Sequence, residues 1–379
     1  MIQLFLCNSV YQVMVAIWMK HSMFMGEETD IIISNHMNGG EAIKERLEAE
    51  ELYRNVYFAK SLEVSRYKRQ FSSKEILASA FSPQKLLQPY VESAGGYTDL
   101  YCANFDPFTQ LLLTTLHRKN SGVKFHLFED GLSTYCDFEK YYRSFENYYY
   151  NAEQDRKNLA KYILHKYIYR LHPLYGNVED VIVFNPELMK WNPGCPVRTL
   201  QKISNKDKEY CELVKRVFGV GESTDYYDTR YIFFEESFFA DGDSINDVEL
   251  VEELASYVGK ENIMVKIHPR NPVNRFAERG FKTNKDTSIP WEVLLLTWED
   301  FDKKIYLTVA SSAILNPIMV FGMKIQAYSL FPCLTVIPKR LQGNAWFFLK
   351  ELFEHYPNMI SICDDMSELI QIDNPGKEV

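Results

Sequence analysis

The sequence predicts an α/β protein built from two Rossmann-like, doubly wound domains. In each half of the chain, short apolar runs alternate with amphipathic stretches, which is the pattern of strands and helices around a parallel sheet. The loop-forming segment Asn192-Pro-Gly-Cys-Pro196 leaves the first half. We therefore expect one domain over residues 1–200 and a second over residues 225–379, facing each other across a cleft.

The first half contains six apolar runs that fit strands. They lie at residues 2–7, 30–34, 55–59, 98–103, 123–128 and 181–185, and the last is expected to end this half. Helices fit the stretches at residues 10–22, 41–52, 84–93 and 107–118. Residues 135–176 break this alternation and contain a helix pattern with a basic face. We interpret it as a core-packing helix, and an interfacial contact with anionic lipid is the alternative.

The second half repeats the α/β alternation after a charged, helical stretch at about residues 200–226. Strands are expected at residues 231–234, 262–267, 304–309 and 324–328. Helices are expected at residues 246–258, 290–297, 312–321 and 343–355. Because the carboxyl ends of parallel strands share one edge of a sheet, side chains that follow these strands are candidates for ligand binding.

Composition excludes several classes of protein. The net charge of −9 argues against nucleic acid as a partner, because binding to phosphate backbones needs clustered Lys and Arg. The seven cysteines have no metal-ligand spacing, and their odd number favours a reducing compartment. Polar residues interrupt the first 19 residues, so we expect a buried strand there and a cytoplasmic protein. Neither GxGxxG nor a P-loop motif occurs.

A histidine follows the buried strand expected at residues 262–267. In Lys266-x-His268-Pro269-Arg270, proline ends the strand and directs His268 toward the space above the sheet edge. Lys266 and His268 are two residues apart, so on an extended strand they share one face. Two potential cations on one face suit a ligand that carries phosphate.

Two further strand ends carry polar groups. Phe128-Glu-Asp-Gly131 ends a strand with adjacent carboxylates, and the glycine permits a sharp turn that presents one acid while the other holds the loop. Asp130 is the candidate general base, although Glu-Asp-Gly is also a common surface turn. Ser311 and Ser312 begin a predicted helix, where hydroxyl and free N–H groups bind an anion or simply cap the helix.

Two further acidic features each have a structural and a functional interpretation. Glu292 lies at the start of another predicted helix, where it caps that helix or accepts hydrogen bonds from ribose hydroxyls. The pairs Asp241-Gly-Asp243 and Asp300-Phe-Asp302 resemble metal-binding DxD motifs, but such pairs arise by chance in a chain with 51 acidic residues. We expect no metal site, and no histidine or cysteine cluster suggests zinc.

Taken in order, these motifs resemble those of bacterial sialyltransferases of the GT-B type. They are Phe128-Glu-Asp-Gly131, Lys266-x-His268-Pro269, Ile289-Pro-Trp-Glu292 and the pair Ser311-Ser312. The chain is most similar to the lipooligosaccharide and capsule sialyltransferases of glycosyltransferase family 52. These also begin with a strand that leads into a glutamine-bearing helix, as residues 4–12 do here. The motif regions extend from about residue 2 to residue 321 and so cover most of the chain.

The resemblance implies a role for each matching residue. Asp130 matches the general base, and His268 matches the histidine that assists departure of the CMP phosphate. The donor-binding positions are Lys266 near the cytosine, Pro269 within the motif, Glu292 at the ribose hydroxyls, and Ser311 with Ser312 at the phosphate. The acceptor side is expected around Asn8, Gln12, Glu129 and Gly131. A second acid of family 52 corresponds to Glu235 or Glu236, which are the alternatives to Asp130 as base.

The implied activity is inverting, metal-independent transfer of sialic acid. The donor would be CMP-sialic acid and the acceptor a galactose-terminated surface glycan of a capsule or lipooligosaccharide. The alternatives are a GT-B transferase that uses a UDP- or GDP-sugar, and a non-catalytic glycan-binding protein. No cofactor is expected. A peripheral contact with the inner membrane face and a homodimer are both compatible with the sequence.

Overall fold

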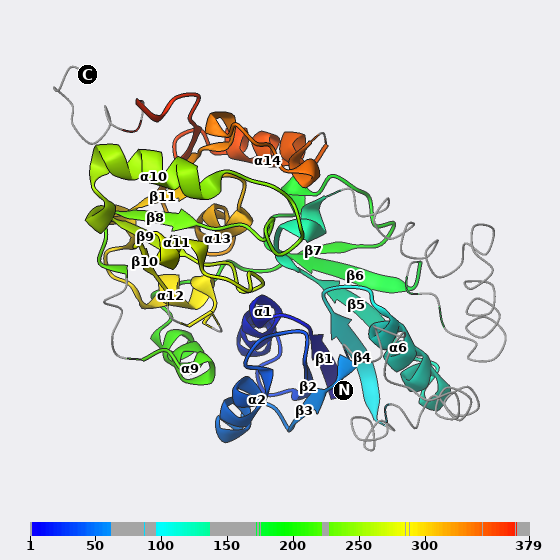
Figure 1. Cartoon of the computed structure of the whole chain (residues 1–379). Helices are drawn as coiled ribbons and strands as arrows, with labels where there is room; N and C mark the ends of the chain where they lie inside the picture. Colours follow the sequence, from blue (N-terminus) through cyan, green and yellow to red (C-terminus); the bar gives the residue numbers. More distant parts are fainter. Residues whose placement is uncertain are drawn as a thin grey trace, which may run out of the picture. The chain divides into compact units, whose positions relative to one another are not determined.

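The computed structural model describes residues 2–61, 87, 96–136, 172, 174, 176–221, 227–284, 286–287, 289–342, 344–367 and 369. The chain divides into two compact units (Figure 1). The first contains Met1–Gln201 with Glu212–Val217, and the second contains Lys202–Cys211 with Phe218–Val379. Helix α9 (Lys208–Phe218) therefore contributes residues to both. The helix expected at 84–93 and the basic helix pattern within 135–176 lie outside the described residues.

The first unit is built on a parallel sheet of seven strands in the order β3-β2-β1-β4-β5-β6-β7. The strands are β1 (Ile2–Cys7), β2 (Glu28–Ser34), β3 (Asn55–Ala59), β4 (Tyr97–Cys102), β5 (Lys124–Phe128), β6 (Val178–Val183) and β7 (Val197–Thr199). The strand order reverses between β1 and β4, which is where open α/β sheets bind their ligands.

Three helices and two short turns connect the described strands of this unit. The helices are α1 (Val10–Ser22), α2 (Gly40–Ala49) and α6 (Pro107–Lys119), and the 3-10 turns are η1 (Gly131–Tyr135) and η3 (Pro186–Leu188). Figure 1 shows α1 and α2 on one side of the sheet and α6 on the other. This distribution follows from right-handed crossovers on either side of the point where the strand order reverses.

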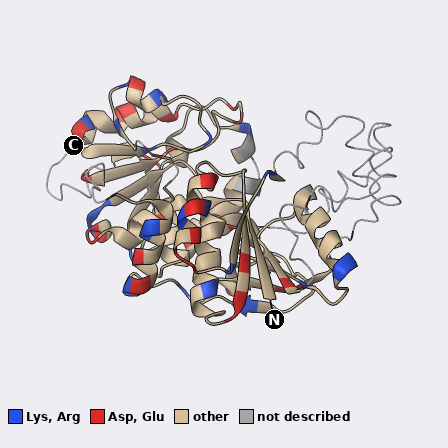
Figure 2. Ribbon diagram, turned by 90° about the horizontal axis from the view of Figure 1, so that it is seen from below, with Lys and Arg blue, Asp and Glu red and all other residues tan. Residues whose placement is uncertain are grey.

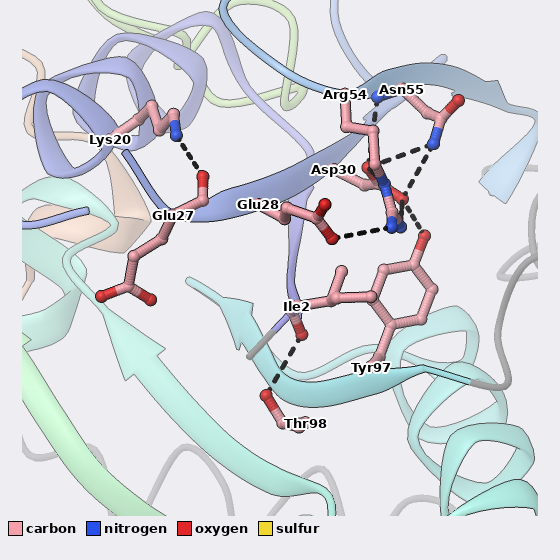
Figure 3. Close-up of polar contacts among 9 residues, drawn as sticks. All are labelled: Ile2, Lys20, Glu27, Glu28, Asp30, Arg54, Asn55, Tyr97 and Thr98. Atoms are coloured by element: carbon pink, nitrogen blue, oxygen red, sulfur yellow. Dashed lines mark hydrogen bonds and ion pairs between the residues drawn. The ribbon is translucent and has the colours of Figure 1, made fainter. Parts of the chain in front are cut away.

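A buried carboxylate ties the amino ends of β2, β3 and β4 together (Figure 3). Arg54 donates to both oxygens of Asp30, with Nε–Oδ1 at 2.9 Å and Nη2–Oδ2 at 2.7 Å. The backbone N–H of Asn55 donates to Asp30 Oδ1 at 3.1 Å, and the Tyr97 hydroxyl donates to Oδ2. Asp30 is fully buried, so these donors replace the water it loses on folding.

The second unit contains a parallel sheet of six strands in the order β10-β9-β8-β11-β12-β13. The strands are β8 (Tyr231–Phe234), β9 (Ile263–Lys266), β10 (Lys282–Thr283), β11 (Ile305–Thr308), β12 (Gln326–Ser329) and β13 (Ile360–Ile362). The helices are α10 (Asp247–Val258), α11 (Arg275–Glu278), α12 (Trp291–Thr297), α13 (Asn316–Met319) and α14 (Asn344–His355). Short 3-10 turns include η5 (Lys260–Asn262), η6 (Phe301–Lys303), η7 (Ser312–Ile314), η8 (Phe331–Cys333) and η9 (Lys339–Leu341).

Two sequence-based expectations for the elements were wrong. The run 181–185 is not the last strand of the first half, because β7 (Val197–Thr199) pairs with β6 after a loop. The helix expected at 312–321 is instead the three-residue turn η7 followed by the four-residue helix α13. Pro317 lacks a backbone N–H, so it is unfavourable in the interior of a helix that began at residue 312, and it lies instead in the first turn of α13, where no such donor is needed.

Charged residues of both signs are interspersed over the helices and loops that Figure 2 shows. In this view the described residues present no continuous basic stripe of the kind that nucleic-acid-binding proteins carry. Among the described helices, none is long and apolar enough to span a bilayer. All seven cysteines are free thiols in the structure.

Candidate functional site

In the first unit, polar side chains gather where the strand order reverses. Asn8 follows β1, and its Nδ2 donates to Asn104 Oδ1 and to Asp106 Oδ2, both at 2.8 Å. Asn104 and Asp106 follow β4, and Asp106 also caps α6 by accepting the N–H of Thr109 at 2.8 Å. Burial raises the pKa of Asp106, and these hydrogen bonds oppose that shift. The carboxyl ends of β1 and β4 are thus joined by one polar cluster.

Asp130 lies beside this cluster, at the carboxyl end of β5. Its Oδ1 accepts a hydrogen bond of 2.5 Å from Gln12 Nε2, and its Oδ2 lies 3.4 Å from the Ser133 hydroxyl. Burial raises the pKa of Asp130 to about 6, and the bonds from Gln12 and Ser133 lower it in part. A half-buried carboxylate with this pKa is ionised at neutral pH and basic enough to accept a proton.

The neighbouring Glu129 has a different environment. It is 1% exposed and accepts hydrogen bonds from the hydroxyls of Tyr11 (2.9 Å) and Tyr135 and from the N–H of Phe184 (2.9 Å). Burial raises its pKa to about 7 against these three donors. Glu129 therefore connects α1, η1 and the end of β6, and it holds the loop from which Asp130 projects.

Gly131 allows the chain to turn directly after the two acids. Its φ is +66°, a conformation that strains any residue with a side chain. The Asp130 N–H then donates to the Thr134 hydroxyl at 2.7 Å, which closes the turn into η1. The sequence of β5, two acids and glycine thus produces one buried and one half-buried carboxyl group at the same sheet edge.

In the second unit, His268 lies beyond the end of β9 in a tight turn. The Asn271 N–H donates to the His268 carbonyl at 3.0 Å, with Pro269 at the second position, where its fixed φ is favourable. The His268 N–H donates to Glu235 Oε2 at 3.1 Å. Strand β9 ends at Lys266, so His268 is outside the strand on which it was expected to share a face with Lys266.

Glu235 follows β8 and is 2% exposed. Its second oxygen accepts from Arg275 Nη2 at 3.0 Å, and Arg275 also forms two bonds of 2.8 and 2.9 Å with Asp247. Burial raises the pKa of Glu235, and its hydrogen bonds to Asn271, His268 and Arg275 oppose the shift. Both carboxylate oxygens are engaged, so Glu235 supports the His268 turn.

Glu236, the next residue, faces the turn after β11. Its Oε1 lies 3.3 Å from the Thr308 hydroxyl, and the Ala310 N–H and the Ser311 hydroxyl also hydrogen-bond to the carboxyl group. Burial raises the pKa of Glu236 to about 8, with a smaller contribution from the charge of Asp247. Glu236 therefore holds a proton at neutral pH and is not an ionised base.

The serine pair lies in the turn η7. Ser311 caps this turn by accepting the Ala313 N–H on its hydroxyl at 3.3 Å, and the Ser312 carbonyl accepts the Leu315 N–H at 2.9 Å.

Lys266 and Glu292 form a third group in this unit, and both are largely buried. Burial lowers the pKa of Lys266 and raises that of Glu292, and their opposite charges counteract both shifts. Glu292 also accepts a hydrogen bond from Asn316 Nδ2. Among the described residues, no three His, Cys, Asp or Glu side chains group as metal ligands.

A family model described as alpha-2,8-polysialyltransferase (POLYST) matches residues 3–329. The chain belongs to the alpha-2,8-polysialyltransferase family. This membership confirms the prediction of a sialyltransferase and hence of a glycosyltransferase. A comparison with curated protein sequences gives no match.

Solved structures show the fold of this polysialyltransferase-family chain. It is similar to an alpha/beta-galactoside alpha-2,3-sialyltransferase from Photobacterium phosphoreum, with a TM-score of 0.51 and 10% identity over 97% of this chain and 99% of that one. It is also similar to Arabidopsis thaliana UGT89C1 complexed with UDP-L-rhamnose, with a TM-score of 0.50 and 10% identity over 98% and 88% of the two chains. The α/β fold of the GT-B class with two Rossmann-like sheets is thereby confirmed.

In the first unit, the structure of this family member brings the sequence-predicted residues together, whereas those of the second unit form the three groups described above. Gln12, Glu129, Asp130 and Gly131 meet at one sheet edge, with Asn8 beside them. The supporting residues were not predicted from the sequence; they are Tyr11, Asp106, Tyr135, Arg275 and Thr308. Asp106 had a detectable signal, because an acid before Pro107 is a typical helix N-cap. Tyr11 lies within the strand-to-helix segment 4–12, but nothing there predicts its partner Glu129. The remaining three are brought into contact with the site only by the fold.

Proposed function

We propose that this protein is an inverting sialyltransferase that uses CMP-sialic acid as its donor. Asp130 accepts the proton of the acceptor hydroxyl as that oxygen bonds to the anomeric carbon of sialic acid. The observation that carries this assignment is the half-buried Asp130 carboxylate with its 2.5 Å bond to Gln12 and a pKa of about 6. Such a group is ionised at pH 7 and gains a proton more readily than an exposed aspartate.

The second unit would bind the donor. The nucleotide lies at the carboxyl ends of β8, β9 and β11, in accordance with the general position of ligands on open parallel sheets. Lys266 is proposed to contact cytosine, Glu292 the ribose hydroxyls, and Ser311 with Ser312 the phosphate. His268 stabilises charge on the departing phosphate. These are the positions of the sialyltransferase motifs, and the polar, half-buried surroundings of His268 and Ser311 support them.

The two acids after β8 are not favoured as the base. Glu235 has both oxygens engaged by His268 and Arg275, and Glu236 is protonated at neutral pH. Asp130 is the remaining candidate of the three. Glu129 is buried and accepts hydrogen bonds from three donors, so its proposed role is to fix the loop that carries Asp130.

The family name favours an acceptor that ends in sialic acid, with transfer to its 8-hydroxyl. The sequence motifs favour a galactose-terminated glycan of a capsule or lipooligosaccharide. Their likeness to glycosyltransferase family 52 supports the further proposal that the chain belongs to that family. We propose that no metal is needed, because His268, Ser311 and Ser312 supply the hydrogen bonds that stabilise charge at the phosphate. From the sequence we further propose that the protein is cytoplasmic and contacts the inner membrane face peripherally. We also propose that it forms a homodimer.

One assay tests these assignments together. CMP release from CMP-sialic acid is measured alone, with lactose, and with an α2,8-linked sialic acid oligomer, each with and without EDTA. Release stimulated by an acceptor and unchanged by EDTA supports the proposed donor and metal-independent mechanism, and the effective acceptor identifies the glycan. No release and no thermal shift with CMP would overturn the proposal. UDP- and GDP-sugars would then be tested, and a glycan-binding protein would show acceptor binding without turnover.

A further inference from the structure

Arg270 lies in the turn after β9, two residues beyond His268. The His268 carbonyl accepts the Asn271 N–H at 3.0 Å, so Pro269 and Arg270 occupy the two central positions of this turn. The Arg270 side chain is 58% exposed, at the edge of the sheet where the donor phosphate is proposed to bind. The proposed reaction leaves this guanidinium group without a role.

Two hydrogen bonds fix the Arg270 guanidinium group without using all its donors. Nη2 donates to the Ser237 hydroxyl at 2.6 Å, and Nη1 donates to Asp241 Oδ1 at 3.1 Å. The Ser237 hydroxyl donates in turn to Asp241 Oδ2 at 2.9 Å. A guanidinium group has five N–H donors in one plane, so three of them have no partner among the residues that the structure describes. The side chain is therefore held in place with donors left for a ligand.

The backbone around Arg270 is anchored as well. The Ala240 N–H, in the loop after β8, donates to Asn271 Oδ1 at 3.1 Å. Asn271 Nδ2 donates to the Glu236 carbonyl at 2.9 Å. The turn after β9 and the loop after β8 are thus joined beside Arg270. A side chain that is ordered before binding loses less conformational entropy when a ligand arrives.

One guanidinium group can serve two carboxylates, and the second unit already contains such an arrangement. Arg275 donates to Asp247 at 2.8 and 2.9 Å and to Glu235 at 3.0 Å. Arg270 has a single carboxylate partner among the described residues, Asp241, and this exposed ion pair contributes little to stability. The planar donors of arginine match a carboxylate in geometry and in charge. The group that best completes the Arg270 site is therefore a carboxylate from a ligand.

We propose that Arg270 binds the carboxylate of the donor sugar and thereby selects 2-keto acid sugars over aldoses. This inference rests on the proposed sialyltransferase function. In CMP-sialic acid the carboxylate and the phosphate oxygen are bonded to the same anomeric carbon, so a phosphate beside His268 brings the carboxylate close to the same turn. At this carbon, UDP- and GDP-aldoses have a hydrogen atom, which gives Arg270 no partner. Arg270 thus determines donor specificity and takes no part in proton transfer.

Binding of three ligands to the full-length protein tests this assignment. Calorimetry compares CMP, CMP-3-fluorosialic acid, which transfers its sugar slowly, and the methyl ester of that analogue, whose carboxyl group has no charge. We expect Arg270→Gln to weaken binding of the fluoro analogue at least about tenfold and to leave CMP affinity within about twofold. The wild type should prefer the acid to the ester, and the variant should not. Equal weakening for all three ligands, or unchanged affinity for the fluoro analogue, would overturn the inference.

A second variant separates carboxylate binding from a purely structural ion pair. Asp241→Asn removes the pair but leaves the charge of Arg270, so affinity for the fluoro analogue should stay the same or increase. If Arg270 only ties the two loops together, Asp241→Asn should weaken binding as much as Arg270→Gln does, which would also overturn the inference. Arg279→Ala, at another exposed ion pair of this unit, is the control that should leave all three affinities unchanged. Failure of the wild type to bind CMP and the analogue would instead overturn the proposed function.

Discussion

Gln12 Nε2 donates a 2.5 Å hydrogen bond to Asp130 Oδ1, while Gln12 Oε1 accepts the N–H of Asn8 at 2.6 Å. One amide side chain at the start of α1 therefore joins the loop after β1 to the acid after β5. Its orientation is fixed, because the backbone N–H of Asn8 requires the oxygen. The nitrogen is consequently directed at the carboxylate, where it stabilises the ionised form.

Substitution of Asp130 by Asn should remove turnover but leave donor binding intact. The amide has nearly the same shape but cannot accept the hydroxyl proton, so we expect kcat to fall by about 10²–10⁴-fold. CMP affinity, measured by calorimetry, should change little, because the proposed nucleotide residues belong to the second unit. Asp228→Asn, at an exposed acid, is the matched control. A variant with wild-type turnover would exclude Asp130 as the base.

The wild-type enzyme should lose activity as the pH falls through about 6. Asp130 must be ionised to accept a proton, and burial raises its pKa to about that value. The Gln12→Ala variant removes a bond that favours the carboxylate, so the pKa of Asp130 should rise further. The acid limb of kcat/KM should therefore move to higher pH. A limb that stays in place would show that another group controls the titration.

Local patterns in the sequence were sufficient to predict much of the fold. The apolar runs of β1 and β8 could be recognised because these strands are buried along nearly their whole length, and α1 is buried continuously from Gln12 to Lys20 and not along one face alone. The strands β7, β10 and β13 were missed. They have only two or three residues, and pairing with a neighbouring strand, rather than their own sequence, defines them.

The candidate site shows the same division between local and tertiary information. Glycine after two acids predicted a turn that separates the carboxyl groups, and the structure places Glu129 inside and Asp130 half-buried. Nothing near Glu235 or Glu236 in the sequence predicted their different environments. Arg275 and Thr308, respectively 40 and 72 residues away, distinguish the two acids.

Loss of the Arg275 side chain should destabilise the second unit. Its guanidinium group pairs with Asp247 and Glu235, whose side chains are 2% and 0% exposed. Removal of one partner from a buried ion pair costs about 3–5 kcal/mol, because unpaired charges remain in the interior. We expect Arg275→Ala to lower the urea midpoint accordingly. Arg279→Ala, which breaks an exposed pair with Glu252, is the control and should cost less than about 1 kcal/mol. Equal effects would contradict the assigned network.

The last prediction concerns the proton on Glu236. Its pKa is raised to about 8 in the folded protein, whereas an exposed glutamate titrates near 4.5, so the folded state binds more protons between these values. Stability should therefore fall as the pH rises from about 5 to 8, and Glu236→Gln should remove this part of the dependence.

The same group hydrogen-bonds to Ser311, the proposed phosphate ligand. CMP affinity should decrease above pH 8 in the wild type, because a carboxylate then forms beside the phosphate, and it should stay constant in Glu236→Gln. Calorimetry in buffers of different ionisation enthalpy measures the accompanying proton uptake. Identical pH profiles for the two proteins would show that Glu236 does not titrate beside the nucleotide.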